Sequence, residues 1–228
     1  MPPDSPNQWP DFEHRVRAGR AIRDIGHALV GHQVPPELLE RISDVLEPLA
    51  AELDRGAPRS RDAASFSQER FAAPGELPLT GYYDRPVSGR SSPWSLDPEM
   101  HRHGDEIEAI VVLRAAHEGA PGRSHGGIVA ALFDDVFGFV LGVVEQPAFT
   151  GELTIRYVAP TPLHRRLSCR VRLAERVGRK LLMTGELVDI EGPDEQLLVR
   201  ANATFIAVDP SAFDQATAER PAPPDEDQ

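Results

Sequence analysis

The chain has 228 residues, with 24 Lys and Arg against 36 Asp and Glu, and a formal net charge of -12 at pH 7. Hydrophobic residues make up 40% of it, and no apolar run is long enough to cross a membrane, so we expect a soluble globular protein with no membrane partner. The acidic balance argues against nucleic acid as a general partner, because non-specific affinity comes from cations on phosphates. Cys169 is the only cysteine and the first residues lack a signal-peptide pattern, which favours the cytoplasm.

The prolines divide the chain, since 13 of the 22 lie in residues 1–98 and only five lie in 99–208. We expect 1–98 to be an extension that contains a helical hairpin at about 11–55 followed by a linker, because apolar residues recur there at helical spacing. Pro48 should kink or shorten the second helix. Residues 99–208 should be the compact domain, and the acidic residues 209–228 should be disordered.

Within 99–208 the pattern predicts an α+β fold. Strands are predicted at 106–114, 151–158, 167–177, 180–190 and 195–208, and one long apolar helix at 125–144. A helix that is apolar on every side must be enclosed, and an antiparallel sheet of five or six strands can wrap around it. This is the layout of a hotdog fold.

The predicted buried helix begins with two glycines, Gly126 and Gly127. Glycines leave the backbone N–H groups of a helix start uncovered, at the positive end of the helix dipole. A carbonyl oxygen that becomes an oxyanion would be stabilised there. The alternative is that the glycines only permit close packing of the helix on a strand.

Asp134 and Asp135 lie in the middle of the same apolar segment. Burial of an unpaired carboxylate is costly, and neighbouring helix positions differ by about 100°, so the two acids need different environments. One interpretation places one acid at a wet dimer seam and pairs the other with an arginine such as Arg156. The other makes one of them a general base or nucleophile in a cleft. The residues alone leave open which acid that is.

Gly126 and Asp134 are eight positions apart, or about 12 Å along a helix axis, so both cannot touch one carbonyl group within one chain. If both act on the same bond, the carboxylate comes from a second chain placed antiparallel to the first. The sequence therefore predicts a two-fold dimer with two equivalent clefts.

The chain resembles the PaaI-like branch of the hotdog acyl-CoA thioesterases over about 99–208. The resemblance rests on His125-Gly126-Gly127, on the acid Asp134 nine positions after the histidine, and on the strand at 149–163 that ends in Tyr-x-x-Pro-x-Pro. It implies that the Gly126 N–H polarises the thioester carbonyl and that Asp134 of the other subunit is the base or nucleophile. It also implies that Thr150 holds the water.

The resemblance places His125 and Gly127 beside the substrate, with His125 orienting the loop. Coenzyme A phosphates need cations, and between Arg156 and Lys180 the chain has eight cations and one acid. The candidates for phosphate contact lie at turn-like positions: Arg165, Arg166, Arg179 and Lys180. The alternative is a solvated strand face that balances acidic charge elsewhere.

The leading hypothesis is hydrolysis of an acyl-CoA thioester by a homodimer or a dimer of dimers, with coenzyme A present only as part of the substrate and no other cofactor. We expect no metal site, because the histidines show no ligand spacing. We expect Cys169 to be a small core residue. The alternatives are a dimer that binds acyl-CoA without catalysis, and a hotdog dehydratase in which His125 would point into the cleft beside the partner's acid.

Overall fold

The computed structural model describes residues 11–57 and 84–209. Its elements, in chain order, are α1 (Phe12–Gly31), α2 (Pro36–Asp54), β1 (Glu99–His103), β2 (Glu106–Val112), η2 (Ala115–His117), α4 (Gly126–Val143), β3 (Ala148–Tyr157), β4 (Arg166–Val177), β5 (Lys180–Asp189) and β6 (Gln196–Ala207). Each strand predicted from the sequence is present within three residues of its expected bounds. The short strand β1 was not predicted.

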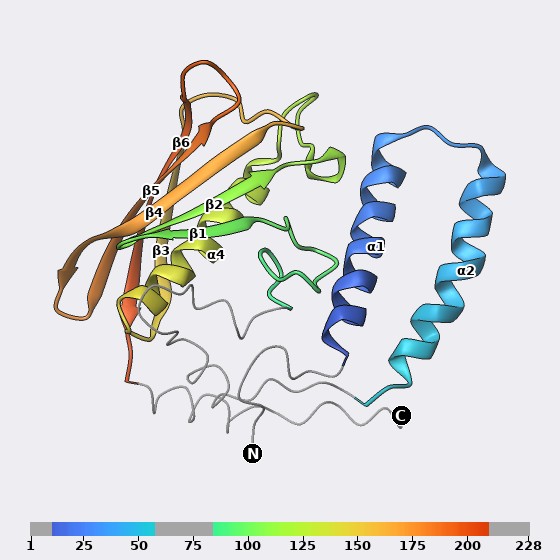
Figure 1. The fold of residues 1–228 in the computed structure, drawn as a ribbon, viewed down its shortest axis with the longest axis horizontal. Helices are drawn as coiled ribbons and strands as arrows, with labels where there is room; N and C mark the ends of the chain where they lie inside the picture. The colour runs from blue at the N-terminus through green and yellow to red at the C-terminus, as the bar shows by residue number, and fades with distance from the viewer. Residues whose placement is uncertain (1–10, 58–83, 210–228) are drawn as a thin grey trace.

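The strands form one six-stranded sheet in the order β1-β2-β4-β5-β6-β3, in which every neighbouring pair is antiparallel. The sheet curves around α4, which lies against its concave side (Figure 1). The hotdog fold predicted from the order of the elements is therefore confirmed. The strand that follows α4, β3, lies at one edge of this sheet.

The sheet-facing side of α4 forms the centre of the core. Phe133 and Phe137 have no exposed surface, and the ring of Phe137 meets that of Phe205 at a centroid distance of 6.3 Å. Gly185 makes room for this packing, because a Cβ there would lie 3.1 Å from the ring of Phe133 and 2.7 Å from Val171. Burial of each large apolar side chain stabilises the fold by roughly 1.5–3 kcal/mol.

By length and mean hydropathy, α4 meets the criteria for a membrane-spanning helix, and no other described helix does. Eight of its residues are buried within the protein, including Leu132 and Val140. Its apolar character is thus accounted for by its place at the centre of the sheet.

The N-terminal helices differ in their packing: α1 contacts the segment before β1 closely, and α2 buries none of its residues. Of the two outcomes expected at Pro48, a kink or a shorter helix, the shorter helix does not occur, because α2 continues through Pro48 to Asp54. The apolar spacing of α2 is the same on both sides of the proline, so one missing N–H does not end the helix. The predicted linker falls partly within 58–83 and the predicted disordered tail almost wholly within 210–228, outside the described residues.

Candidate active site

The start of α4 is held by a loop that is hydrogen-bonded to its neighbours. His125 is the N-cap residue, and its Nδ1 accepts a hydrogen bond of 3.0 Å from the N–H of Gly127. The N–H of His125 donates to the carbonyl of His117 at 2.8 Å, and the N–H of Ser124 donates to that of Thr161 at 2.9 Å. His125 therefore orients the helix start through its ring nitrogen.

Gly126 is the first residue of α4. Within the described part of the chain, its N–H has no hydrogen-bond partner, as expected for a first-turn donor. The hydroxyl of Tyr157 donates to the Gly126 carbonyl at 2.7 Å, and a Cβ on Gly126 would lie 2.9 Å from that hydroxyl oxygen. A glycine is therefore required here, and its N–H is available to an incoming oxygen atom.

The N-terminal end of α4 opens onto a groove of about 390 Å³. Its walls come from the loop before α4 and from the end of β3 with the turn that follows it, namely Arg123, Ser124, Gly126, Tyr157, Val158, Ala159, Pro160 and Thr161. We had assigned no role to Tyr157, although it belongs to the Tyr-x-x-Pro-x-Pro pattern. Its hydrogen bond to a backbone carbonyl is not predicted by any sequence pattern.

Asp134 lies on the exposed side of α4, next to the edge strand β3. Its Oδ1 accepts a hydrogen bond of 2.9 Å from the hydroxyl of Thr150 on β3. The helix and the edge strand thus bring together two of the predicted site residues that are 16 positions apart. A carboxylate held by one donor keeps its other oxygen for a water molecule or a substrate.

Asp135 has a different environment, because the guanidinium of Arg85 binds it. The Nε of Arg85 donates to Asp135 Oδ1 at 2.8 Å, and its Nη2 lies 2.7 Å from the same oxygen. The guanidinium carbon also lies 4.4 Å from the ring centroid of Phe139. The sequence had suggested Arg156 as the kind of arginine that pairs with one of the acids, and the structure corrects this to Arg85, which precedes β1.

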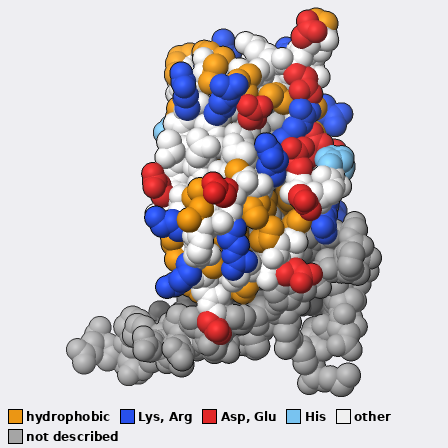
Figure 2. Space-filling view, turned by 90° about the vertical axis from the view of Figure 1, so that its left-hand side faces the viewer, with side chains coloured by type: hydrophobic (Ala, Val, Ile, Leu, Met, Phe, Trp, Pro, Cys, Tyr) orange, Lys and Arg blue, Asp and Glu red, His pale blue; other side chains and the backbone are white. Residues whose placement is uncertain are grey.

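The predicted phosphate ligands do not form one group. Arg165 and Arg166 lie at the start of β4, whereas Arg179 and Lys180 lie beyond its other end, and a strand of this length spans roughly 40 Å. Lys and Arg side chains are interspersed with acidic ones on the described face shown in Figure 2.

Three of these four cations have partners among the described residues. The Nη2 of Arg165 donates to Asp189 at 2.9 Å, and this bond lowers the pKa of Asp189. The Nε of Arg179 donates to the carbonyl of Ala207 at 3.1 Å. Arg166 has only a loose ion pair of 3.7 Å with Glu99.

Other reactive side chains are held in structural positions. Cys169 has no exposed surface, and burial raises the pKa of its thiol, which makes it a poor nucleophile. Among the described residues, no group of three or more His, Cys, Asp or Glu side chains is placed to hold a metal ion.

No protein-family model matches the chain. Over 93 residues it is 33% identical to the acyl-coenzyme A thioesterase THEM4 of Mus musculus, a match that covers 41% of this chain and 39% of that protein. The chain therefore spans less than half of that relative.

Among solved structures, a thioesterase superfamily protein matches with a TM-score of 0.69 and 26% identity, over 84% of this chain and 90% of that one. The PaaI protein of the E. coli phenylacetic acid degradation operon matches with a TM-score of 0.45 and 13% identity, over 49% of this chain and 83% of that one. A coverage of 84% extends beyond 99–208, so the first match includes part of the N-terminal region.

Proposed function

We propose that this chain, a hotdog-fold protein of the thioesterase superfamily, hydrolyses acyl-coenzyme A thioesters to a free acid and coenzyme A. The observation that carries the proposal is that two adjacent carboxylates have different environments. Asp134 faces outward and accepts a hydrogen bond from Thr150, whereas Asp135 is bound by Arg85. The similarity to a mouse acyl-coenzyme A thioesterase supports the choice of substrate class.

In this mechanism Asp134 takes a proton from water, which attacks the thioester carbonyl, or Asp134 attacks that carbon itself. The negative charge that develops on the carbonyl oxygen is stabilised by the N–H of Gly126. The carbon–sulfur bond then breaks, and the thiolate of coenzyme A takes up the proton that Asp134 removed from water. In the nucleophilic route the acyl-Asp134 anhydride is hydrolysed by a water molecule, which gives the free acid, restores the carboxylate and supplies the proton for the thiolate. Thr150 orients the carboxylate or the water beside it.

The reaction needs two copies of the chain. Gly126 and Asp134 are separated by eight residues of α4, about 12 Å, so the cleft at one Gly126 takes its carboxylate from a second copy. A two-fold pair of chains then has two equivalent clefts. The active species is accordingly a homodimer, or a dimer of dimers.

Of the predicted phosphate ligands, Arg166 is the one that we propose for the coenzyme A phosphates at this cleft. Its pair with Glu99 is long and both side chains are more than half exposed, so the guanidinium can exchange partners. It follows Pro162 by four residues, and Pro162 pairs with Arg123 of the groove. Arg166→Gln should raise KM and leave kcat unchanged, and Lys180→Gln is the matched control at the far end of β4.

The test of the mechanism is the Asp134→Asn variant, assayed by release of free thiol from a panel of acyl-CoA substrates. Loss of the general base should lower kcat by about 10²- to 10⁴-fold without lowering the melting temperature. Asp135→Asn is the matched control and should retain most of kcat while losing stability. A wild-type rate for Asp134→Asn would refute the assignment, and the reverse ranking would move the role to Asp135.

The two alternatives make different predictions in the same assay. A non-catalytic acyl-CoA-binding dimer would bind the substrate tightly and release no thiol. A dehydratase would use His125 as its base, yet the Nδ1 of this ring accepts from Gly127 as the helix cap. We therefore rank the dehydratase below the other two.

A further inference from the structure

The helix α2 exposes a complete apolar face. The helix has seven large aliphatic side chains. At 100° per residue they all fall within an arc of about 120° of the helix circumference: Leu38, Leu39, Ile42, Val45, Leu46, Leu49 and Leu53. Not one residue of α2 is buried, and Leu53 is 75% exposed. Amphipathic helices of this length gain most of their stability from packing that face, so α2 requires an occupant.

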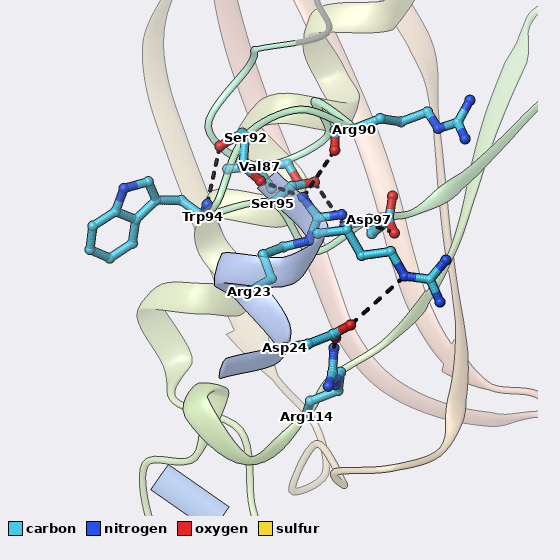
Figure 3. A network of polar contacts seen from close by, with 10 residues as sticks. Arg23, Asp24, Val87, Arg90, Ser92, Trp94, Ser95, Asp97 and Arg114 are labelled. Carbon is cyan, nitrogen blue, oxygen red and sulfur yellow. Dashed lines mark hydrogen bonds and ion pairs between the residues drawn. The ribbon is translucent and has the colours of Figure 1, made fainter. Parts of the chain in front are cut away.

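The helix α1 has two faces, and only one of them packs on other described residues of the chain. On the inner face, Arg23 reaches into the loop before β1, where its Nη1 donates to the carbonyl of Arg90 at 3.0 Å and its Nη2 lies 3.2 Å from Asp97 (Figure 3). On the outer face, an exposed apolar stripe recurs at helical spacing: Ile22, Ile25 and Leu29. The side chains of both stripes stay exposed, 39% at Ile25 and 49% at Leu49, so neither stripe covers the other among the described residues; Figure 1 shows the two helices joined at one end.

The charges of the two helices are complementary. Besides Arg23, which is buried on the inner face and bonded to the loop before β1, α1 carries three arginines and two acids, whereas α2 carries six acids and one arginine. No ion pair or hydrogen bond joins a charged side chain of α2 to another described residue. Two α2 helices would repel each other, and an anionic membrane would repel the acidic polar face. The α1 helix of a second copy has an apolar stripe and the opposite charge.

We propose that α2 packs against the outer face of α1 from a second copy of this chain, and that the two pairs of helices form a four-helix bundle. A two-fold axis makes both contacts at once, because each copy offers one acidic and one basic helix. The occupant is thus a second copy, which the proposed function also requires, but the contact depends on none of the catalytic residues. The similarity to a thioesterase superfamily structure over 84% of this chain places part of this extension within a shared architecture.

The arrangement also connects the bundle to the active site. The inner face of α1 holds η2, since the Nδ1 of His27 accepts a hydrogen bond of 3.1 Å from the N–H of Ala116. The carbonyl of the next residue, His117, accepts from the N–H of His125 at the start of α4. A partner helix on α1 would thereby steady the loop that carries Gly126.

The test is cysteine cross-linking in the full-length chain, where Cys169 is fully buried and does not compete. Ile25→Cys is combined in turn with Ile42→Cys, Leu46→Cys and Leu49→Cys, oxidised with copper phenanthroline, and resolved on a non-reducing gel. At least one combination should move most of the protein to twice the chain mass, and reduction should reverse it. Ile25→Cys with Glu40→Cys, on the polar face of α2, is the control and should stay at the chain mass.

Each remaining outcome overturns the proposal. A disulfide that consumes both thiols at the mass of a single chain would place α2 on its own α1. The absence of any disulfide in all three combinations would assign the face to another occupant, such as residues 58–83. Thiol release from acyl-CoA is measured on the same samples, so that loss of cross-linking and loss of hydrolysis are scored separately.

Discussion

The two faces of α4 differ in what they contribute. Phe133 and Phe137 point into the sheet with no exposed surface, whereas Asp134, one residue after Phe133, lies on the exposed side beside Thr150. Consecutive residues of a helix differ by about 100°, so one segment supplies both the core and the candidate chemistry. Substitutions on the inner face should therefore lower stability, and those on the outer face should lower the rate.

The largest expected effect on stability is that of Phe133→Ala. Removal of a fully buried ring from the centre of the core should lower the free energy of unfolding by about 3–5 kcal/mol. Urea denaturation monitored by circular dichroism measures the loss. Asp134→Asn is the comparison on the other face and should unfold within about 0.5 kcal/mol of wild type. An equal loss of stability in both variants would contradict the separation of α4 into a core face and a face that serves the reaction.

A second prediction concerns the loop before α4, where burial and the neighbouring His27 and Arg114 lower the pKa of His117 to about 4. Unfolding restores a pKa of about 6.5, so between these values the unfolded state binds the extra proton and stability falls as pH falls. The loss should total about 3 kcal/mol between about pH 7 and pH 4 and should level off below that.

His117→Asn tests this assignment, because an asparagine oxygen can accept the 3.0 Å hydrogen bond from the N–H of Arg114 without titrating. Urea midpoints measured across the same pH range should then change less than in wild type. An unchanged slope would assign the pH dependence to other groups, of which His27 is the first to examine because burial also lowers its pKa.

Gly126→Ala should act on the rate. The added Cβ would lie 2.9 Å from the hydroxyl oxygen of Tyr157, so the ring or the helix start must move. A displacement of this size near reacting atoms costs about 10²-fold in kcat. Gly127→Ala is the control, because a Cβ there meets only the His125 ring at 3.1 Å. Steady-state thiol release compares them, and equal rates for Gly126→Ala and wild type would contradict the requirement for a glycine at the start of α4, since alanine keeps the backbone N–H and differs only in its Cβ.

The smallest expected effect is that of Tyr157→Phe, which removes only the hydroxyl that donates to the Gly126 carbonyl. Loss of one exposed hydrogen bond should lower the free energy of unfolding by about 0.5–1.5 kcal/mol and should lower kcat by less than tenfold. Thermal unfolding and thiol release measure the two quantities. If the loss of kcat corresponds to more free energy than the loss of stability, Tyr157 contacts the substrate directly.

Much of the fold followed from local pattern. The apolar helix and the alternating strands were predictable because periodicity acts over a few residues. The turn between β4 and β5 is equally local, since Gly178 has the positive φ of 59° that a tight turn needs. Strand β1 was missed because Glu99–His103 is polar and exposed, and only its pairing with β2 makes it a strand.

The candidate site was predictable only in part. The spacing of Gly126, Asp134 and Thr150 resembles a known family, and this brought the three residues together before any geometry was known. Arg85 and Tyr157 were not assigned, since each acts through contacts with residues at least 31 positions away. Such contacts depend on how the helices and strands pack, and the periodicity of the sequence does not predict them.

By itself the sequence determined that one apolar helix must be enclosed by an antiparallel sheet, and that two carboxylates within that helix need separate environments. Only the tertiary structure decided which environment each carboxylate has. Arg85, 50 residues before Asp135, folds back to neutralise it, and β3 brings a hydroxyl to Asp134. The physical reason is that the environment of a charge is set by the groups around it in space, which local chain pattern does not specify.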